Sequence, residues 1–466
     1  MKTAQIGIYG LGTMGRALAL NLAEHGIVTA VANRETDWID PFVEGASHLG
    51  ENLLPAYDLE SFVKRLDTPR TVLFMIPSGP PLDVMLDHVL PLLDAGDMVV
   101  DAGNADFNET VRRSARVQAL GIDYVGMGVS GGARGARHGP SMMVGGDDHS
   151  WTRLAPVLCP IAARFEGDPC VAHMGPDGAG HFVKTVHNGI EYADMQMIAE
   201  IYGLLRDGGG WDAPAIGQLF RAWSGGPLAS FLVDVTAIAL AAMDEETHQP
   251  LVDVILDKAG QKGTGRWSVI EALKLGQSAS TIEGAVGARA WSAALDVRRT
   301  AADVLPGTSV VGGLPGAHVL ERALLAGRIL SHAQGFDILR AASQEHAWDL
   351  DLARIAEIWR AGCILRSDLL SDIAKSLAAD PPQGQLVLAP GMVALLDQSV
   401  PALRQVVGAA VQTGLPVPAL SAALAWYDSL RQARGNANLI QAQRDVFGSH
   451  GFERIDKTGR FNGEWG

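Results

Sequence analysis

Short apolar runs alternate with amphipathic segments along the first third of the chain. Residues 5–9 form one such run, a Gly-rich turn follows, and apolar positions then recur at helical spacing to about residue 25. The same alternation continues, with strand patterns at 27–32, 71–76, 98–101 and 122–126 and helix patterns at 82–93 and 108–120. It predicts a parallel, doubly wound sheet, which is the Rossmann-like α/β class.

The pattern changes after the first third. From residue 178 to about residue 434 the apolar positions keep helical spacing with almost no strand signal, which predicts a large all-α domain. The remaining residues are polar and rich in Gly, Asn and aromatic side chains, so we expect an extended C-terminal tail. The predicted domains are therefore 1–177, 178–434 and 435–466.

One uncharged run, residues 405–427, is long enough to be weighed as a membrane span. Gly414, Pro416 and Pro418 interrupt it, so we interpret it as two buried helix ends with a connecting loop. The N-terminus passes at once into a Gly-rich turn and lacks the apolar core of a signal peptide. No membrane association is expected.

The amino-acid composition, the net charge and the cysteines exclude several classes of partner. The 466 residues are 47% hydrophobic and 19% charged, which is typical of a globular protein with more than one domain. A net charge of −15 argues against nucleic acid or an anionic membrane as the main partner, so an anionic substrate needs a local group of Arg and Lys. Cys159, Cys170 and Cys363 match no disulfide framework or metal site, which indicates a reducing compartment, and the cytoplasm is expected.

Gly10, Gly12 and Gly15 form a GxGxxG pattern between the first strand and the first helix. Such glycines permit a tight turn and let a pyrophosphate approach the helix N-terminus closely, so the pattern predicts a dinucleotide site. The alternative is a glycine-rich turn that serves packing alone.

The end of the second strand bears on the choice between NAD and NADP. Asn33 and Arg34 stand where an acidic residue would bind the ribose hydroxyls of NAD, and Arg suits a 2′-phosphate. Glu35 follows directly, and its carboxylate would oppose that phosphate. The two signals conflict.

The stretch 178–192, GAGHFVKTVHNGIEY, carries the candidate chemistry. At 100° per residue its polar side chains Lys184, His187, Asn188 and Glu191 share an arc of roughly 100° on a helix, and apolar residues occupy the opposite side. Lys184 and Glu191 lie two turns apart, close enough to act on one small molecule as base and acid if burial lowers the lysine pKa. An ordinary surface face of ion pairs is the alternative.

Two further loops carry polar groups suited to anions. The GVSGG loop, 128–132, follows a strand and presents backbone N–H groups beside Ser130, which predicts a carboxylate site, and Asn104 is expected in the same crevice. Turn glycines and a capping amide are the alternative. Lys262 and Thr264 lie in a glycine-rich loop, and together with Arg289 they predict a phosphate clamp. A solvated basic loop remains possible for this second group.

The whole chain resembles the 6-phosphogluconate dehydrogenase family. Seven motifs match in order and spacing: GLGTMG, GVSGG, GAGHFVKTVHNGIEYADMQ, LDKAGQKGTGRW, LRAAS, WRAGC and NLIQAQRDVFGSH. The resemblance implies oxidative decarboxylation of 6-phosphogluconate to ribulose 5-phosphate and CO2 with reduction of NAD(P)+, in the pentose phosphate pathway and gluconate utilisation. No metal is required for this chemistry, because a β-keto acid is its own electron sink.

The resemblance also implies roles for individual residues. Lys184 is the general base and Glu191 the general acid. The sugar acid is contacted by Asn104, Ser130, Gly131, Gly132, His187 and Asn188, and its phosphate by Tyr192, Lys262, Thr264 and Arg289. Arg444 and His450 come from the tail of a second subunit, which implies a homodimer, with pairing into tetramers left open. The nucleotide is held by Gly10, Gly12, Thr13, Met14, Gly15, Asn33, Arg34, Glu35, Met75 and Asn104.

Three departures from the family pattern qualify this expectation. Glu35 stands where the NADP-binding stretch usually has a small hydroxyl residue, and Pro77 where many NADP-dependent members have Lys. Both remove positive potential, so we expect relaxed or NAD-shifted use although NADP is the family default. Ala133 and Arg134 replace a usual acidic pair, which leaves the charge at the nicotinamide end open.

Two other functions agree with parts of the sequence. A β-hydroxyacid dehydrogenase of the 3-hydroxyisobutyrate type shares the glycine loops and the lysine, but such chains are shorter and lack the NLIQAQRD motif. A non-catalytic nicotinamide-nucleotide-binding protein would not need both Lys184 and Glu191.

Overall fold

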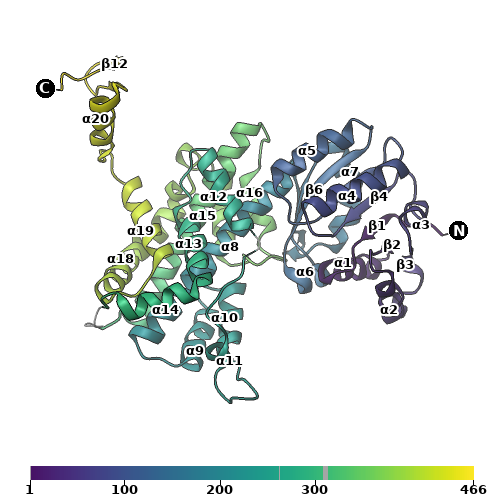
Figure 1. Ribbon diagram of the computed structural model, residues 1–466, viewed down its shortest axis with the longest axis horizontal. Coiled ribbons are helices and arrows are strands. Elements are labelled where there is room, and N and C mark those ends of the chain that lie inside the picture. Colours follow the sequence, from purple (N-terminus) through teal and green to yellow (C-terminus); the bar gives the residue numbers. More distant parts are fainter. Residues whose placement is uncertain (1, 262, 308–312, 466) are drawn as a thin grey trace.

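The computed structural model describes residues 2–261, 263–307 and 313–465. A sheet with helices on both sides forms one end of the molecule, a larger group of helices forms the other, and the C-terminal tail projects away from the helices (Figure 1). The expected class, a Rossmann-like α/β domain followed by a large helical domain, is confirmed.

Within the described residues, the main sheet has eight strands in the order β10-β7-β6-β5-β4-β1-β2-β3. Their bounds are β1 Ile6–Tyr9, β2 Thr29–Ala32, β3 Leu53–Pro55, β4 Thr71–Phe74, β5 Met98–Asp101, β6 Asp123–Val129, β7 Met142–Gly145 and β10 Val171–Gly175. A separate short pair, β8 Arg164–Phe165 and β9 Asp168–Pro169, precedes β10.

Two apolar cores cover the two faces of this sheet, because side chains alternate along each strand. Along β1, Ile6 and Ile8 belong to one core, and Gly7 faces Phe62 in the other. The first core includes residues of α1 Thr13–Glu24, α2 Ile39–Gly45 and α7 Asp148–Ile161. The second includes residues of α3 Leu59–Lys64, α4 Pro80–Val89 and α5 Phe107–Gln118.

The predicted strands β1, β2, β4, β5 and β6 pair parallel, as expected, but the complete sheet also contains one antiparallel pair that the sequence patterns did not predict. β7 pairs antiparallel with β6, and β10 then pairs parallel with β7. A single short helix, α6 Gly132–His138, joins β6 to β7, which lets the chain return beside β6 without a full crossover. The sequence patterns also missed β3, β7 and β10, each of five residues or fewer.

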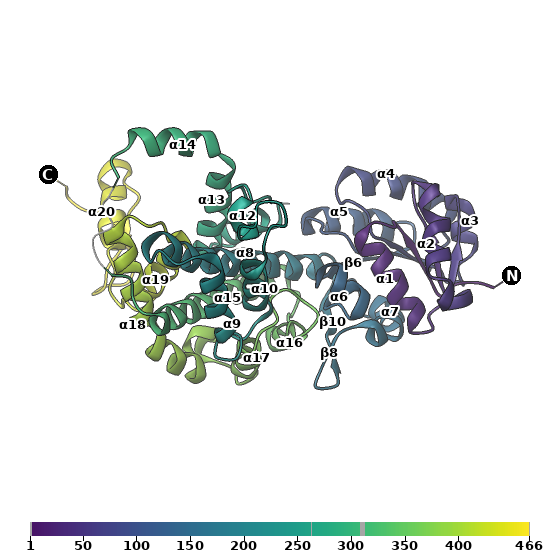
Figure 2. The ribbon, with the colours of Figure 1, turned by 90° about the horizontal axis from the view of Figure 1, so that it is seen from below.

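The helical part is built around two long helices, α8 Ala179–Gly203 and α15 Ala317–His346, which pack against each other. Both are buried over most of their length, and their buried side chains include polar ones such as Lys184 and Arg328. Around them lie α9 Ala213–Trp223, α10 Phe231–Ala241, α11 Leu251–Val254, α12 Thr264–Lys274, α13 Ser280–Ala293, α14 Leu295–Val304, α16 Leu352–Ile358, α17 Leu369–Ala378, α18 Pro390–Thr413 and α19 Pro418–Leu430. Figure 2 shows α8 running from this group towards the sheet.

The uncharged run 405–427 spans the end of α18, a loop and the start of α19, as predicted. Gly414 ends α18 in the left-handed conformation, and Pro418 opens α19. Within the residues described, no helix combines the length and the apolar character needed to cross a membrane.

The tail differs in part from the prediction. It projects from the molecule, but it is not extended throughout, since it contains α20 Ala437–Gly448 and the two-stranded ribbon of β11 Phe452–Glu453 and β12 Arg460–Phe461. Residues 437–447 contain neither Pro nor Gly, which lets them form a helix despite their polar composition.

Candidate active site

Glycines bring α8 directly onto the sheet. A Cβ atom added to Gly128 would lie 2.4 Å from Cβ of Lys184, and one added to Gly180 would lie 2.5 Å from the backbone oxygen of Gly126. Only glycine permits such an approach. The N-terminal half of α8 therefore lies across the end of β6, and Lys184 stands beside Ser130 in the loop that follows.

A chain of polar contacts links four buried side chains, those of Lys184, Ser130, His187 and Asn188. Lys184 Nζ donates to Ser130 Oγ at 3.0 Å, Ser130 Oγ lies 3.3 Å from His187 Nε2, and His187 Nδ1 lies 3.3 Å from Asn188 Oδ1. One set of donors satisfies all three contacts if the ring proton is assigned to Nδ1, since the Ser130 hydroxyl then donates to Nε2. Lys184 Nζ also lies 3.4 Å from His187 Nδ1.

Burial shifts the pKa values of Lys184, His187 and Glu191. Desolvation lowers the pKa of Lys184, although the nearby Glu191 carboxylate opposes the shift. Desolvation also holds the pKa of His187 well below its usual value, and the charge of Lys184 adds to that effect, so the imidazole is neutral. Desolvation raises the pKa of Glu191, against the pull of Lys184 and Arg289. The site favours a neutral lysine and a protonated glutamic acid more than water does.

Glu191 stands at the open side of this group. Its Oε2 lies 3.7 Å from His187 Nδ1, and its side chain is 21% exposed, whereas that of His187 is fully buried. Lys184 and Glu191 therefore lie on the same side of α8, two turns apart. This arrangement suits a reaction that needs a base and an acid on the same small molecule.

The wall opposite α8 contains residues to which the sequence patterns assigned no role. The backbone oxygen of Gly362 accepts from Ser141 N at 2.9 Å, and a Cβ on Gly131 would lie 2.4 Å from the same oxygen. The GVSGG loop therefore packs directly against the backbone at Gly362. The ring of Trp359 packs edge-on against His187 at 5.2 Å. These residues lie within or beside the WRAGC motif, which was the signal that pointed to them.

The predicted phosphate clamp is brought together in part. The guanidinium of Arg289 lies 3.5 Å from the ring centre of Tyr192, and the same ring packs on Gly265, where a Cβ would lie 2.5 Å from it. Thr264 precedes Gly265 as the first residue of α12 and is buried. Lys262 lies outside the described residues. Tyr192 is thus held between α12 and α13, one residue beyond Glu191.

The GxGxxG turn has the geometry of a nucleotide site. Gly10 has φ +113°, and a Cβ on it would lie 2.5 Å from the backbone oxygen of Met75. A Cβ on Gly15 would lie 1.8 Å from the oxygen of Gly10, whereas Gly12 faces open space. Gly12 caps α1, which continues with Thr13 and has no acidic residue in its first turn, so a pyrophosphate can approach its N-H groups.

Asn33 connects this turn to the end of β2. Its Oδ1 accepts from Leu11 N at 2.8 Å, and its Nδ2 donates to Glu35 Oε2 at 3.2 Å. Arg34 pairs with the carboxylate of Glu35, with Nε at 2.7 Å from Oε1. The pairing also lowers the pKa of Glu35, so the carboxylate is charged and the guanidinium already has an anionic partner.

The remaining predicted residues lie in three other parts of the molecule. Asn104 is exposed after β5, and its backbone oxygen accepts from Ser78 Oγ at 2.6 Å. Met14 packs against the first core, in the first turn of α1. Arg444 and His450 are exposed on the projecting tail, and among the described contacts neither reaches Lys184 of the same chain.

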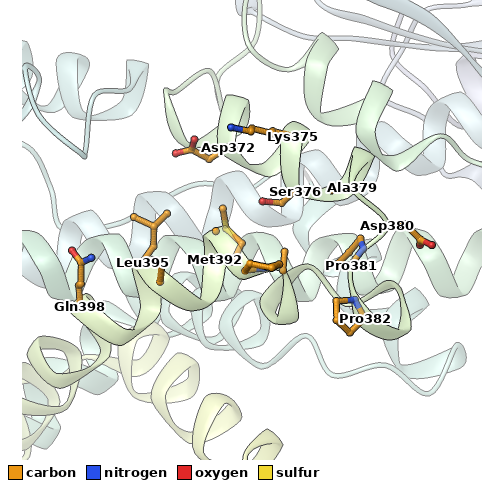
Figure 3. Close-up of a pocket in the computed structure, with 14 residues that line it drawn as sticks. Asp372, Lys375, Ser376, Ala379, Asp380, Pro381, Pro382, Met392, Leu395 and Gln398 are labelled. Atoms are coloured by element: carbon orange, nitrogen blue, oxygen red, sulfur yellow. The ribbon is translucent and has the colours of Figure 1, made fainter.

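A hollow of about 630 Å³ lies between α17 and α18 (Figure 3). Lys375, Ser376, Met392 and Leu395 are among its lining residues. Of the predicted site residues that the structure describes, none lines this hollow.

A glycine-rich dinucleotide turn in a Rossmann-like domain, together with Lys184 and Glu191 on one face of α8, defines a nicotinamide-nucleotide-dependent oxidoreductase. Two family models match the chain: the NAD binding domain of 6-phosphogluconate dehydrogenase over residues 5–175, and the 6-phosphogluconate dehydrogenase C-terminal domain over residues 180–465. The chain belongs to the 6-phosphogluconate dehydrogenase family.

Individual relatives agree with this assignment. The chain is 46% identical to the decarboxylating 6-phosphogluconate dehydrogenase of Escherichia coli (strain K12) and 43% identical to the NADP(+)-dependent decarboxylating enzyme of Bacillus subtilis (strain 168), over 100% of both chains in each case. The 6-phosphogluconate dehydrogenase of Plasmodium falciparum is 34% identical, and its structure matches with a TM-score of 0.95 over 99% of this chain and 100% of that one. That enzyme was solved in its apo form, with NADP+ and with 6-phosphogluconate.

Proposed function

We propose that this enzyme oxidises and decarboxylates 6-phosphogluconate to ribulose 5-phosphate and CO2, the reaction of its family in the pentose phosphate pathway. The observation that carries the proposal is the pairing of a desolvated Lys184 with a desolvated Glu191 on one face of α8. Burial moves the two pKa values towards each other, as a base and an acid acting in one cycle require.

Lys184 acts first as the base. When neutral, it takes the proton of the C3 hydroxyl while the hydride leaves C3, which gives a 3-keto acid. The bound nicotinamide supplies the hydride acceptor. The resulting ammonium of Lys184 then donates to the C3 oxygen while the C1 carboxylate leaves as CO2, because a positive charge at that oxygen stabilises the enediol that forms. Ser130 Oγ accepts from Nζ and holds the amine in place.

Glu191 acts last as the acid. It delivers a proton to the enediol carbon that was C2 of the sugar acid and becomes C1 of ribulose 5-phosphate, and its raised pKa favours the protonated form that this step needs. Its position two turns from Lys184 on the open side of α8 supports this role.

The substrate roles proposed for the other residues follow the layout of the crevice. Ser130, Gly131, Gly132, His187, Asn188 and Asn104 bind the carboxylate and hydroxyls. Tyr192, Thr264 and Arg289, together with Lys262, bind the phosphate at the far end, where the Arg289 guanidinium lies over the Tyr192 ring.

For the nucleotide, Gly10, Gly12, Thr13, Met14 and Gly15 would hold the pyrophosphate, with Met75 and Asn104 lining the path to the crevice. Asn33, Arg34 and Glu35 would face the adenosine ribose. A 2′-phosphate there would have to displace the Glu35 carboxylate from Arg34, whereas a free 2′-hydroxyl can donate to that carboxylate. We therefore propose that both NADP and NAD are used, with a shift towards NAD relative to NADP-dependent members.

We further propose a cytoplasmic homodimer in which each tail serves the partner's site. The three domains would then be 1–177 for the nucleotide, 178–434 for substrate and dimerisation, and 435–466 for the partner. Exposed apolar side chains on α20 support the second copy, since Leu439 is 62% and Phe447 74% exposed. Arg444 and His450 on the same tail would reach the phosphate of the partner's substrate.

The test is an assay of nucleotide reduction and CO2 release with 6-phosphogluconate and each nicotinamide in turn. Formation of one CO2 per reduced nucleotide is expected with both cofactors. Reduction without CO2, or activity with 3-hydroxyisobutyrate in place of 6-phosphogluconate, would contradict the proposal.

A further inference from the structure

The tail has an unusual interior. Across its described residues, 435–465, the one buried side chain is a carboxylate, that of Asp445, which is 2% exposed. The apolar side chains of α20 point outward, and Val446, directly after Asp445, is 58% exposed. The fold of the tail therefore depends on polar contacts and not on an apolar core of its own.

Four hydrogen bonds converge on Asp445. Its Oδ1 accepts from Gly451 N at 2.7 Å and from Asn462 Nδ2 at 2.6 Å. Its Oδ2 accepts from Gly463 N and from Trp465 Nε1, both at 2.7 Å. These donors lower the pKa of Asp445 to about 2, so the group remains charged at neutral pH. One carboxylate thus ties α20 to the turn after it and to the chain beyond β12.

The same contacts fix the two residues that the proposed function assigns to the partner's site. Arg444 is the neighbour of Asp445 on the last turns of α20. His450 lies between that helix and Gly451, its backbone oxygen accepts from Arg460 Nε at 3.0 Å, and its ring lies against Gly448, where a Cβ would be 2.6 Å from Nε2. The position of His450 relative to Arg444 therefore depends on the turn that Asp445 closes.

We propose that Asp445 is a positioning residue for catalysis: it prefolds the tail so that Arg444 and His450 reach the substrate phosphate of the partner subunit together. The inference rests on the proposed function, in which those two residues bind that phosphate. Asp445 itself does not touch substrate. Its contribution is to hold two binding groups in one geometry before the tail docks.

The test is Asp445→Asn in the full-length enzyme. Asn has the same shape, but it replaces one acceptor oxygen by an NH2 group that faces two donors, so half of the contacts are lost. The KM for 6-phosphogluconate should rise about tenfold or more, with a smaller change in kcat and an unchanged KM for the nucleotide. The residual kcat/KM for gluconate, which lacks the phosphate, should be the same as in the unmodified enzyme.

Asp456→Asn is the matched control, because this exposed carboxylate of the same tail pairs with Arg454 alone among the described contacts. It should leave every constant unchanged. If Asp445→Asn fails to give a folded dimer, Trp465→Phe, which removes one of the four donors, should raise the KM for 6-phosphogluconate in the same selective way. A selective KM effect that disappears in an Arg444→Ala background supports the positioning role.

Two results would overturn the inference. If Arg444→Ala raises the KM for 6-phosphogluconate but neither Asp445→Asn nor Trp465→Phe does, the tail needs no positioning by Asp445, and the proposed function stands. If Arg444→Ala also leaves that KM unchanged, the tail does not bind the phosphate, and the shared-site part of the proposed function fails with it.

Discussion

Lys184 Nζ and Ser130 Oγ lie 3.0 Å apart across the boundary between the helices and the sheet. The lysine belongs to α8 and the serine to the loop after β6, 54 positions earlier in the chain. Both side chains are buried, so the contact fixes the amine at the point where the two parts of the molecule meet. A change at either residue should therefore affect chemistry more than folding.

Ser130→Ala is expected to lower kcat/KM for 6-phosphogluconate about 10- to 100-fold, because it removes the acceptor that orients Nζ and a hydroxyl proposed to contact the substrate. Steady-state kinetics measure this, and Ser47→Ala, an exposed serine in the same domain, is the control. Unchanged kinetics would show that the hydroxyl does not orient the amine.

Glu35→Thr is expected to shift the preference between nucleotides towards NADP by about tenfold or more, since it frees Arg34 and removes a charge that repels the 2′-phosphate. The measurement is the ratio of kcat/KM with NADP to that with NAD. Glu44→Thr, an exposed glutamate on α2, should leave the ratio as it was. Strict NADP use by the unmodified enzyme, with no effect of the substitution, would place Glu35 outside the ribose site.

The shared site can be tested by mixing. Arg444→Ala and Lys184→Met proteins should each be nearly inactive, and in a two-fold dimer that combines them one site is intact and the other doubly damaged. After refolding in equal amounts about half the dimers are hybrids, so about a quarter of the normal activity should return. If hybrids form and activity does not return, each tail serves its own subunit.

Glu200 gives a prediction for stability and pH. It lies on α8, it is buried, and its carboxylate accepts from the backbone N–H groups of Ala419 and Leu420 at the start of α19. Desolvation raises its pKa from 4.5 to about 7. The folded state keeps a proton that the unfolded state releases in this window, so stability falls as the pH rises from 4.5 to 7.

Glu200→Gln removes this titration. Between pH 5 and pH 8 the unmodified protein should lose about 1–3 kcal/mol of stability relative to the variant, measured by chemical denaturation at both values. Glu283→Gln, an exposed glutamate on α13, should show no such divergence. Equal pH dependence of Glu200→Gln and the unmodified protein would mean that Glu200 is charged in the folded state.

Sequence patterns could predict the features that depend on neighbours in the chain. The GxGxxG turn, with its strand and helix, is local, and so is the face of α8 that carries Lys184 and Glu191. The assignment of those two residues as base and acid rests on the resemblance to a family as well as on this helical pattern.

Features that depend on distant segments could not be predicted in this way. The antiparallel pairing of β7 with β6 depends on the direction in which the chain runs after α6. The apolar pattern of the four residues of β7 does not determine that direction. The packing of Trp359 against His187 joins residues far apart in sequence. The contacts of Asp445 could not be predicted, because an acidic residue in a polar tail is usually exposed. Its burial arises only when the tail folds.

The central claim, that Lys184 is the base of the reaction, is tested most directly by the turnover of Lys184→Met with saturating 6-phosphogluconate and nucleotide. Met fills a similar volume but cannot take a proton, so kcat should fall by roughly 10²–10⁴ with little change in substrate binding. Lys375→Met, at an exposed lysine on α17, should retain full turnover. Near-normal turnover by Lys184→Met would contradict the account.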